Sequence, residues 1–208
     1  MSLSTYQNKD VNPVANLSDF IWSKEKSLSK SFCKNMIKKF DASDHQQYDG
    51  KIGTGQTDPW IKQTRDLVIG SNLDDWQEED DTLYKSLKDG LDEYSAYLDS
   101  IHPSLVFSPL IKLHDTGFQI QRYEPEGFYE WHHDWTMNND CSRVWTFIWY
   151  LNTLKKKDGG YTQFIDGTKV QPKAGKLVLF PATWNYLHRA FPPKVRKYIA
   201  TGWVYGKL

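Results

Sequence analysis

The stretch "GFQIQRYEPEGFYEWHHDW" (residues 117–135) marks the point at which the sequence becomes rich in β-forming residues. Its two aromatic-rich runs, "GFQIQRY" and "FYEWHHDW", are separated by the turn-forming residues of "EPEG". Similar short runs follow as far as residue 205: "RVWTFIWYLN", "YTQFIDG", "KVQP", "KLVLFP", "WNYLHRAF" and "RKYIATGWVY". Seven or eight short strands without helical periodicity between them predict a mainly β domain, either an antiparallel barrel or a double-sheet jelly roll.

The first half of the chain is expected to supply two helices. Apolar residues recur at helical spacing within residues 27–43 and again within residues 81–101. Gly90 lies inside the second pattern, where glycine costs about 1 kcal/mol relative to alanine. Both segments are therefore predicted to be amphipathic helices that pack against the outside of the β structure.

The connection between these helices has a different composition. The stretch "DGKIGTGQTDPW" (residues 49–60) is typical of a loop, and "TRDLVIG" (residues 64–70) is compatible with a strand. We expect a single domain over residues 1–208, with helical support and loops in residues 1–116 and the β core in residues 117–208.

Composition narrows the partners and the compartment. The 26 Lys and Arg balance the 26 Asp and Glu, so no net charge attracts the protein to nucleic acid or to an anionic membrane. No secretory signal pattern and no apolar stretch of membrane-spanning length is present in the sequence. Its two cysteines, Cys33 and Cys141, fit neither a disulfide framework nor a zinc ribbon. We therefore expect a soluble, cytoplasmic protein.

The sequence His132-His133-Asp134 is the first candidate for chemistry. Side chains alternate along a strand, so His132 and Asp134 are expected on one face and His133 on the other. A histidine hydrogen-bonded to an aspartate on a wet face would explain this pair equally well. His188, on a later predicted strand, adds a second imidazole, and two histidines with one carboxylate form the facial triad of non-haem Fe(II) oxygenases. Zinc is a competitor for the same ligands.

Lys197 is the second candidate, because it lies nine residues after His188 in a predicted strand. A lysine that faces the interior of a jelly roll is costly unless an anion accompanies it. A small dicarboxylate would be such an anion.

These motifs together resemble a known family. "RYEPEGFYEWHHDW", "RVWTFIWYLN", "GGYTQF", "KAGKLVLF" and "HRAFPPKVRKYIATGW" occur in the order and spacing of the Fe(II)- and 2-oxoglutarate-dependent dioxygenases, in their prolyl 4-hydroxylase-like branch. The spacing of the last motif is similar to that of the oxygen-sensing prolyl hydroxylases. The resemblance covers residues 117–205 and implies an α+β, mainly β fold with a double-stranded β-helix (jelly-roll, cupin-like) core.

The resemblance also implies roles for individual residues at the metal. His132, Asp134 and His188 correspond to the catalytic iron ligands. The carboxylate of Asp134 points to hydroxylation, because related halogenases lack a carboxylate there. Arg143 lies where the branch can have an arginine near the mouth of the active site, although a surface salt bridge would explain it as well.

Four further residues correspond to the cosubstrate site. Lys197 takes the place of the basic residue that pairs with the distal carboxylate of 2-oxoglutarate, and Tyr150 matches a tyrosine that hydrogen-bonds the same group. Tyr123 matches a tyrosine near the cosubstrate, and Trp203 an aromatic residue on the pocket wall. Arg196 is the alternative to Lys197, because neighbours on a strand face opposite sides; we favour Lys197.

The implied function is hydroxylation of an unactivated C–H bond, with decarboxylation of 2-oxoglutarate to succinate. The expected cofactors are Fe(II), 2-oxoglutarate and ascorbate as a reductant, and the expected partners are dioxygen and an unidentified peptide, amino acid or other small molecule. Two alternatives stay open at this point. One is a nucleic-acid demethylase with the same iron centre, against which the neutral charge argues, and the other is a non-catalytic metal-binding jelly-roll module.

Overall fold

The computed structural model describes residues 16–70, 74–101, 112–138 and 140–207. Within these residues, two α-helices accompany two antiparallel sheets. In chain order the elements are η1 (Leu17–Phe20), β1 (Trp22–Lys24), α1 (Lys30–Ala42), η2 (Asp44–Gln46), β2 (Tyr48–Asp49), β3 (Arg65–Ile69), η3 (Asp74–Trp76), α2 (Gln77–Ile101), β4 (Lys112–Asp115), β5 (Phe118–Tyr123), β6 (Tyr129–His132), β7 (Met137–Asn138), β8 (Cys141–Tyr150), η5 (Lys156–Asp158), β9 (Thr162–Phe164), β10 (Lys169–Val170), β11 (Leu177–Pro181), β12 (His188–Ala190) and β13 (Lys197–Lys207).

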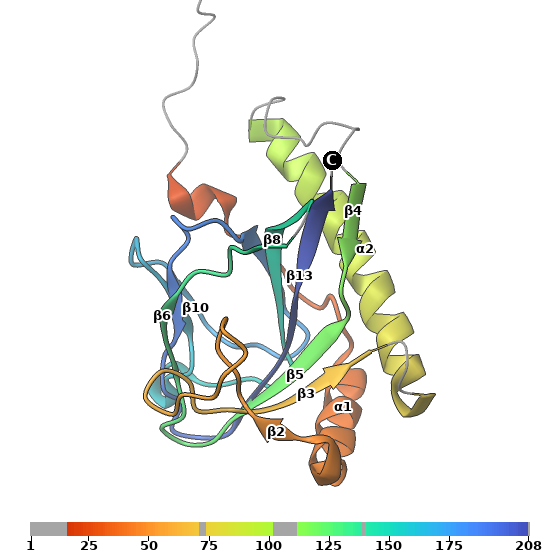
Figure 1. The fold of residues 1–208 in the computed structure, drawn as a ribbon, viewed down its shortest axis with the longest axis vertical. Helices are drawn as coiled ribbons and strands as arrows, with labels where there is room; N and C mark the ends of the chain where they lie inside the picture. Colours follow the sequence, from red (N-terminus) through yellow and green to blue (C-terminus); the bar gives the residue numbers. More distant parts are fainter. Residues whose placement is uncertain (1–15, 71–73, 102–111, 139, 208) are drawn as a thin grey trace, which may run out of the picture.

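The two sheets form the layers of a jelly roll (Figure 1). The large sheet has the order β1-β11-β8-β13-β5-β3-β2, with β4 beside β13 and β7 beside β8. The small sheet has the order β10-β9-β12-β6. Strands far apart in sequence are neighbours, since the last strand, β13, pairs with both β5 and β8. This arrangement confirms the predicted mainly β jelly-roll fold.

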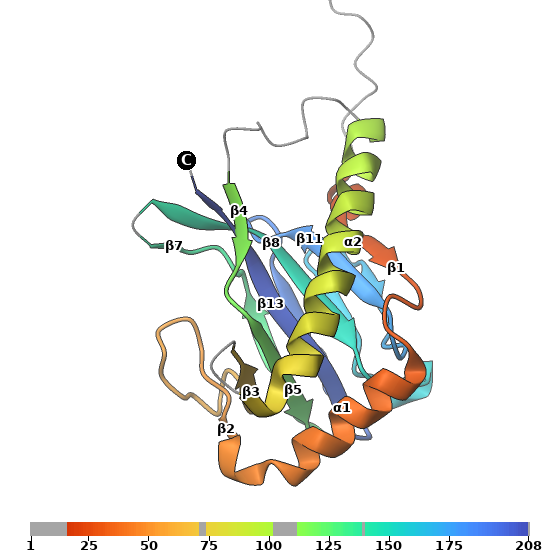
Figure 2. The same cartoon turned by 90° about the vertical axis from the view of Figure 1, so that its right-hand side faces the viewer.

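Both predicted helices are present, and they cover the face of the large sheet that points away from the small sheet (Figures 1 and 2). α1 begins after Ser29, whose hydroxyl accepts a hydrogen bond from the backbone N–H of Phe32 and so satisfies one of the free donors at the helix start. The apolar faces of the two helices join the residues of the large sheet in one core. Its helical members are Cys33, Met36, Phe40, Leu83, Leu87, Tyr94 and Leu98.

Gly90 lies at the contact between α2 and the sheet. A Cβ atom at this position would lie 2.4 Å from Cδ2 of Leu177 on β11, so the leucine side chain would have to shift within the core. The glycine therefore lets the helix approach the sheet closely, and the packing offsets its low helix propensity. Sequence periodicity alone indicated only the unfavourable helix propensity of this glycine.

A second core fills the space between the two sheets. Alternation along β13 explains the separation, because Tyr198 and Ala200 join the helix-side core while Ile199 joins the interior. Lys197, on the same face of β13 as Ile199, also points into this interior. The other buried members of the interior core are Tyr123, Ile148, Tyr150, Phe164, Val178, Phe180 and Tyr186.

Several short strands were not predicted. β1, β2, β4 and β7 are two to four residues long, so none of them shows a period-2 pattern that sequence could reveal. β1 pairs with β11 and β2 with β3, so the first half of the chain extends the large sheet at both ends of its strand order. The predicted strand at residues 64–70 is confirmed as β3.

Candidate metal and cosubstrate site

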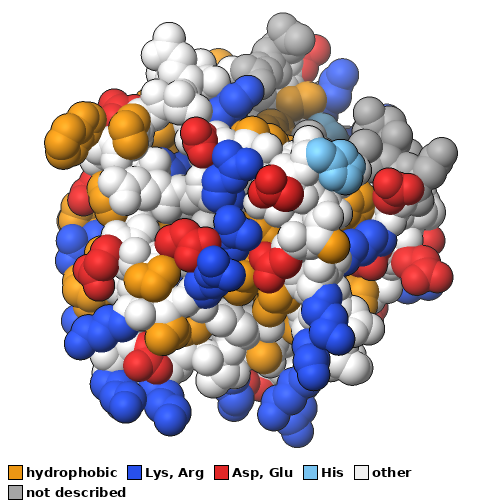
Figure 3. Space-filling model, turned by 90° about the horizontal axis from the view of Figure 1, so that it is seen from below, with side chains coloured by type: hydrophobic (Ala, Val, Ile, Leu, Met, Phe, Trp, Pro, Cys, Tyr) orange, Lys and Arg blue, Asp and Glu red, His pale blue; other side chains and the backbone are white. Residues whose placement is uncertain are grey.

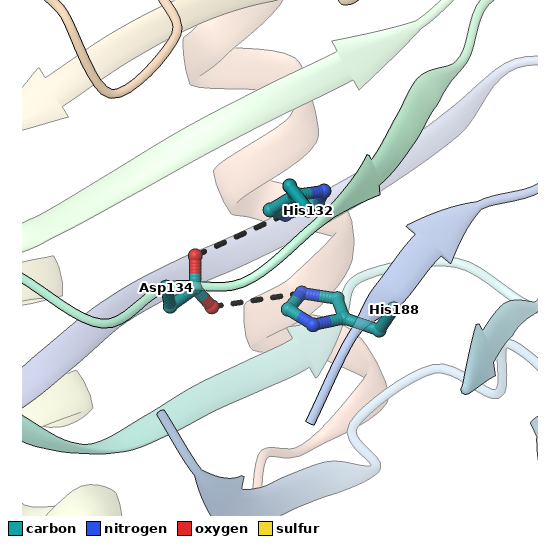
Figure 4. A group of neighbouring side chains, drawn as sticks. All are labelled: His132, Asp134 and His188. Atoms are coloured by element: carbon teal, nitrogen blue, oxygen red, sulfur yellow. Dashed lines mark ion pairs between the residues drawn. The ribbon is translucent and has the colours of Figure 1, made fainter. Parts of the chain in front are cut away.

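Three of the predicted site residues converge between the sheets. His132, the last residue of β6, lies directly opposite His188, the first residue of β12. The carboxylate of Asp134 lies between their rings, with Oδ1 3.8 Å from Nε2 of His132 and Oδ2 3.5 Å from Nε2 of His188 (Figure 4). Their ligand atoms all lie within 4.8 Å of one another, so a single ion could be held by all three. Asp134 and His188 are buried, and His132 is mostly buried.

The route by which Asp134 reaches this position differs from the prediction. β6 ends at His132, so Asp134 lies beyond the strand and strand alternation does not orient it. Two residues of β8 hold it instead: Thr146 donates its hydroxyl to Oδ2 at 2.8 Å, and Arg143 donates to the backbone carbonyl at 3.2 Å. His133 is exposed, as expected for the neighbour that points away from the ion site.

Backbone carbonyls fix the tautomers of both histidines. Nδ1 of His132 lies 2.7 Å from the carbonyl oxygen of Glu130, and Nδ1 of His188 lies 3.0 Å from that of Tyr186. Because a carbonyl only accepts, Nδ1 carries the proton in each ring. Nε2 is then the unprotonated atom, and in both rings it faces Asp134. This is the arrangement that metal-binding histidines use.

The surroundings favour the ionisation states that a metal requires. Burial, followed by the nearby charge of His188, lowers the pKa of His132 well below its usual range, so its ring is neutral near pH 7. For Asp134, burial acts to raise the pKa, but the two histidines and the Thr146 hydroxyl outweigh burial and lower it. Two neutral imidazoles and one carboxylate are the donor set of non-haem iron sites.

Lys197 lies in the same cavity as the three ligands. Its side chain is 1% exposed, whereas the side chain of Arg196 is 57% exposed and pairs with Glu124 at 2.8 Å. Among the described residues Lys197 has no carboxylate partner, and its Nζ lies 3.8 Å from the centroid of the Tyr123 ring. Burial lowers the pKa of Lys197 to about 7. Of the two candidates, the structure therefore directs Lys197 into the cavity and Arg196 to the surface.

The remaining predicted residues occupy different places. Tyr123 and Trp203 line the cavity, and the indole N–H of Trp203 is buried without an acceptor in the described part of the chain. Tyr150 is buried behind the wall, with its hydroxyl 2.7 Å from Oγ1 of Thr162. Thr162, rather than Tyr150, contributes to the cavity lining.

Sequence reasoning missed Thr146 and Thr162. A single buried threonine has no distinctive spacing, so only its place on the inner face of β8 or β9 identifies it. Neither His102 nor His114 lies in any of the motifs quoted from the sequence, and no site role was expected for them. His114 is exposed and stacks on Tyr205, and His102 lies outside the described residues.

A wider cleft opens beside the metal site. Its volume is about 450 Å³, and the three groups His132, Asp134 and Trp203 belong to its wall as well as to the wall of the inner cavity. The loop around Lys51, and Arg143 near the start of β8, form other parts of the cleft. A substrate that entered this cleft would therefore lie next to the ion.

The residues present fit both an iron ion and 2-oxoglutarate. His132, Asp134 and His188 supply the ligands for the ion. The buried ammonium of Lys197 lacks an anion, and the buried N–H of Trp203 lacks an acceptor, within the residues that the structure describes. A dicarboxylate would satisfy both kinds of group. Such a molecule would lie between the ion and Lys197.

Comparisons with known proteins agree with this geometry. Residues 118–205 match the family model described as the 2OG-Fe(II) oxygenase superfamily, and no curated protein matches the chain in sequence. Solved structures share the fold. A prolyl hydroxylase from Trichoplax adhaerens, in complex with a hypoxia inducible factor peptide fragment, has a TM-score of 0.71 at 17% identity, over 90% of this chain and 84% of that one.

Two further prolyl hydroxylases are similar in structure. The viral collagen prolyl hydroxylase of Paramecium Bursaria Chlorella virus-1, in its 2OG complex, has a TM-score of 0.65 at 19% identity, over 89% of this chain and 96% of that one. The prolyl-4-hydroxylase of Pseudomonas putida has a TM-score of 0.62 at 20% identity, over 88% of this chain and 91% of that one. At these identities the likeness shows the fold.

The fold and the triad together define an oxygenase that depends on a non-haem metal. The matched segment carries His132, Asp134 and His188 and also Lys197. Residues 118–205 are accordingly similar to the 2OG-Fe(II) oxygenase superfamily, and the fold is the one seen in prolyl hydroxylases.

Proposed function

We propose that this oxygenase is a prolyl 4-hydroxylase-like hydroxylase that acts on a peptidyl or free amino acid. The observation that carries the proposal is the placement of a buried, anion-free Lys197 in the same cavity as the three ligand residues. A structural metal site would not need such a cation, whereas a dicarboxylate cosubstrate requires one.

The proposed roles follow from the contacts. His132, Asp134 and His188 hold Fe(II), which together with 2-oxoglutarate and dioxygen supplies the chemistry that hydroxylates a C–H bond and leaves succinate. Lys197 forms a charge-assisted hydrogen bond with the distal carboxylate and so fixes the length and orientation of the cosubstrate. Thr146 keeps the Asp134 carboxylate in place for the ion.

The remaining cavity residues complete the cosubstrate site. Thr162 presents its hydroxyl at the cavity wall, with Tyr150 supporting it from behind at 2.7 Å. Tyr123 limits the space around Lys197 through the face of its ring, and the indole N–H of Trp203 offers one more donor. These groups exclude water from the charged end of the cosubstrate, which strengthens its electrostatic interactions.

The substrate is expected to enter through the wider cleft. The Trichoplax structure contains a peptide, which makes an extended peptide the first candidate for this chain. Nucleic acid is disfavoured because the chain is neutral, and because acidic and basic side chains are interspersed on the face shown in Figure 3.

The proposal extends to the organisation and the setting of the enzyme. Residues 1–208 act as one catalytic unit, because helices and edge strands from the first half complete the large sheet and the cleft. A cytoplasmic location and ascorbate as a reductant are part of the proposal. Both cysteines are free, which suits a reducing compartment, and no helix in the described residues could cross a membrane.

Anaerobic titration tests the cosubstrate assignment. Fe(II) with 2-oxoglutarate should produce the weak visible charge-transfer band expected of the family, and Lys197→Met should weaken 2-oxoglutarate binding strongly. The matched control is Arg196→Met, which removes the neighbouring cation from the surface and should leave the band unchanged. An unchanged 2-oxoglutarate affinity in Lys197→Met would contradict the assignment of this residue.

Turnover tests the reaction. Under air, the protein should convert 2-oxoglutarate to succinate, and a panel of proline-containing peptides and free proline should include members that gain one oxygen atom by mass spectrometry. A parallel panel of methylated single-stranded oligonucleotides should lose no methyl group. Demethylation of an oligonucleotide without hydroxylation of any peptide or amino acid would overturn the proposed substrate class.

A further inference from the structure

A buried ion pair lies beside the metal site and has no part in the roles described above. Nζ of Lys62 lies 2.7 Å from Oδ2 of Asp66, and the two side chains are 3% and 0% exposed. Isolating two charges from water is expensive, and apolar residues of similar size are often as good for stability. A purely structural role therefore does not explain the pair. Lys62 also lines the wide cleft.

From Lys62, a chain of contacts leads to the metal site. Its Nζ lies 5.2 Å from the centroid of the Tyr129 ring, within reach of a cation–π interaction. The Tyr129 ring in turn stacks on His132, with ring centroids 3.6 Å apart and planes inclined by 14°. Backbone hydrogen bonds from residue 63 to the carbonyl of residue 128, and from residue 130 to the carbonyl of residue 61, flank this contact. The ammonium group thus holds the tyrosine that fixes the plane of one ligand.

From Asp66, hydrogen bonds lead to the cosubstrate end of the cavity. Gln119 donates to Oδ2 of Asp66 at 3.0 Å, and Gln121 donates to the side-chain oxygen of Gln119 at 3.1 Å. Tyr123 donates its hydroxyl to the side-chain oxygen of Gln121 at 3.0 Å, and its ring faces the ammonium of Lys197. Residues 119, 121 and 123 alternate along β5, so all three point to the same side of the sheet.

The directions of these hydrogen bonds are consistent from one end to the other. A tyrosine hydroxyl donates to Gln121, so the amide of Gln121 presents its oxygen to Tyr123 and its NH₂ to Gln119. Gln119 then presents its oxygen to Gln121 and its NH₂ to the carboxylate of Asp66. The charge of Asp66, held by Lys62, therefore determines how each amide in the row is turned.

We propose that the Lys62–Asp66 pair is a positioning unit that links the two halves of the active site. Lys62 keeps the Tyr129 ring on His132, and Asp66 keeps the Tyr123 ring on Lys197 through Gln119 and Gln121. The inference rests on the proposed function, because it takes His132 as an iron ligand and Lys197 as the partner of 2-oxoglutarate. Neither residue of the pair touches the ion or the cosubstrate itself.

The two branches can be separated by substitution. Gln121→Met interrupts the branch to Tyr123 and should raise the dissociation constant of 2-oxoglutarate about tenfold, with Fe(II) affinity unchanged. Lys62→Met removes the cation that serves both branches, and it should raise both dissociation constants by about tenfold or more, the range expected for groups that support metal ligands. Both constants are measured anaerobically, Fe(II) without cosubstrate and 2-oxoglutarate from the charge-transfer band.

The chain offers a matched control for loss of an ion pair. Lys88 and Asp92 have the same i, i+4 spacing at 3.1 Å, but their side chains are 64% and 70% exposed on α2. Lys88→Met should change neither dissociation constant. If Lys62→Met does not fold, Gln119→Met takes its place. This variant leaves the ion pair intact and interrupts the hydrogen-bonded row from Asp66 to Tyr123 one step earlier. Like Gln121→Met, it should raise the dissociation constant of 2-oxoglutarate and leave Fe(II) affinity unchanged.

The outcomes distinguish the inference from the proposed function. A wild-type protein that forms no charge-transfer band with Fe(II) and 2-oxoglutarate would overturn the proposed function, and the inference with it. The inference alone would be overturned if the wild type forms a normal band and the folded variants Gln121→Met and Lys62→Met keep unchanged dissociation constants. Where Gln119→Met replaces Lys62→Met, the same criterion applies to it. An equal rise in both constants in Gln121→Met would show a general structural effect and would also reject the two-branch arrangement.

Discussion

His132 and His188 are direct cross-strand partners, and each donates its Nδ1 proton to the backbone carbonyl two residues earlier. The pairing of β6 with β12 therefore fixes the separation of the two rings, while the backbone fixes their tautomers. Both Nε2 atoms are unprotonated before any ion binds. The carboxylate of Asp134 is the one ligand of the three that is not oriented by a strand, and it depends on side chains of β8.

Thr146→Val should weaken metal binding. The substitution preserves shape but removes the hydroxyl that donates to Oδ2 of Asp134 at 2.8 Å. Loss of such a supporting group costs about 10- to 100-fold in metal affinity. Anaerobic Fe(II) titration measures the effect. Thr146→Ser, which keeps the hydroxyl, should restore most of the affinity, and a Ser variant as weak as the Val variant would show that packing, and not the hydrogen bond, matters.

Thr162→Val and Tyr150→Phe should differ in their effects on the cosubstrate. Thr162 reaches the cavity itself, whereas the Tyr150 hydroxyl contacts Thr162 and the carbonyl of Val170. We expect the 2-oxoglutarate dissociation constant to rise about tenfold in Thr162→Val, as for one lost hydrogen bond to a charged group, and less in Tyr150→Phe. A larger effect of Tyr150→Phe than of Thr162→Val would indicate that Tyr150 contacts the cosubstrate directly, as the sequence resemblance implies.

Binding of 2-oxoglutarate should depend on pH through Lys197. Burial lowers the pKa of this lysine from its usual 10.5 to about 7 in the ligand-free protein, so it loses its charge as the pH rises through 7. The cosubstrate carboxylate requires the charged form. Affinity should therefore be constant below pH 7 and fall above it, by at most about tenfold per pH unit for one proton.

Calorimetry can detect the proton directly. At pH 8, binding of 2-oxoglutarate should take up a proton from the buffer, seen as a binding heat that varies with the ionisation enthalpy of the buffer. Lys197→Arg provides the control, because arginine stays charged at this pH and should take up none. Absence of proton uptake in the wild type at pH 8 would contradict a lowered pKa of Lys197.

Two glycines with left-handed backbones should differ in their tolerance of alanine. Gly175 has φ +81°, and a Cβ there would lie 2.1 Å from the carbonyl oxygen of Leu28; Gly167 has φ +91° with open space around it. Gly167→Ala should cost about 1–2 kcal/mol of unfolding free energy from backbone strain alone. Gly175→Ala should cost clearly more, because it also separates two backbone segments. Urea unfolding measures the unfolding free energy of both variants. Equal losses of unfolding free energy would contradict a close approach between Gly175 and the backbone of Leu28.

The site was partly predictable because its ligands have recognisable chemistry. His132, Asp134, His188 and Lys197 were identified from residue type, spacing and family resemblance, and the structure brings all four to one cavity. The sequence favoured Lys197 but left Arg196 as an alternative, because the register of β13 was not known. It also gave no reason to single out Thr162, since a threonine gains its role only from the direction in which its strand presents it.

The fold was predictable where patterns are long and not where they are short. The two helices and the longer strands β5, β8 and β13 carry enough residues for a clear period, and each was found in the expected place. β1, β2, β4 and β7 are too short to show one, so their pairing depends on neighbours far away in the chain. Gly90 shows the same limit, because its value lies in the contact with Leu177 on another element.

The amino-acid sequence was enough to predict the fold class and the types of metal ligand, because these depend on local periodicity and on the chemistry of individual side chains. The resemblance to the oxygenases came from the order and spacing of its motifs. Three further points needed the packed fold: which hydroxyl reaches the cavity, which of two adjacent cations faces inward, and how Asp134 is held beyond the end of its strand. The packing of the fold also places Lys62 and Asp66 beside the candidate active site. Such relationships depend on strand register and burial, which arise when distant segments pack together.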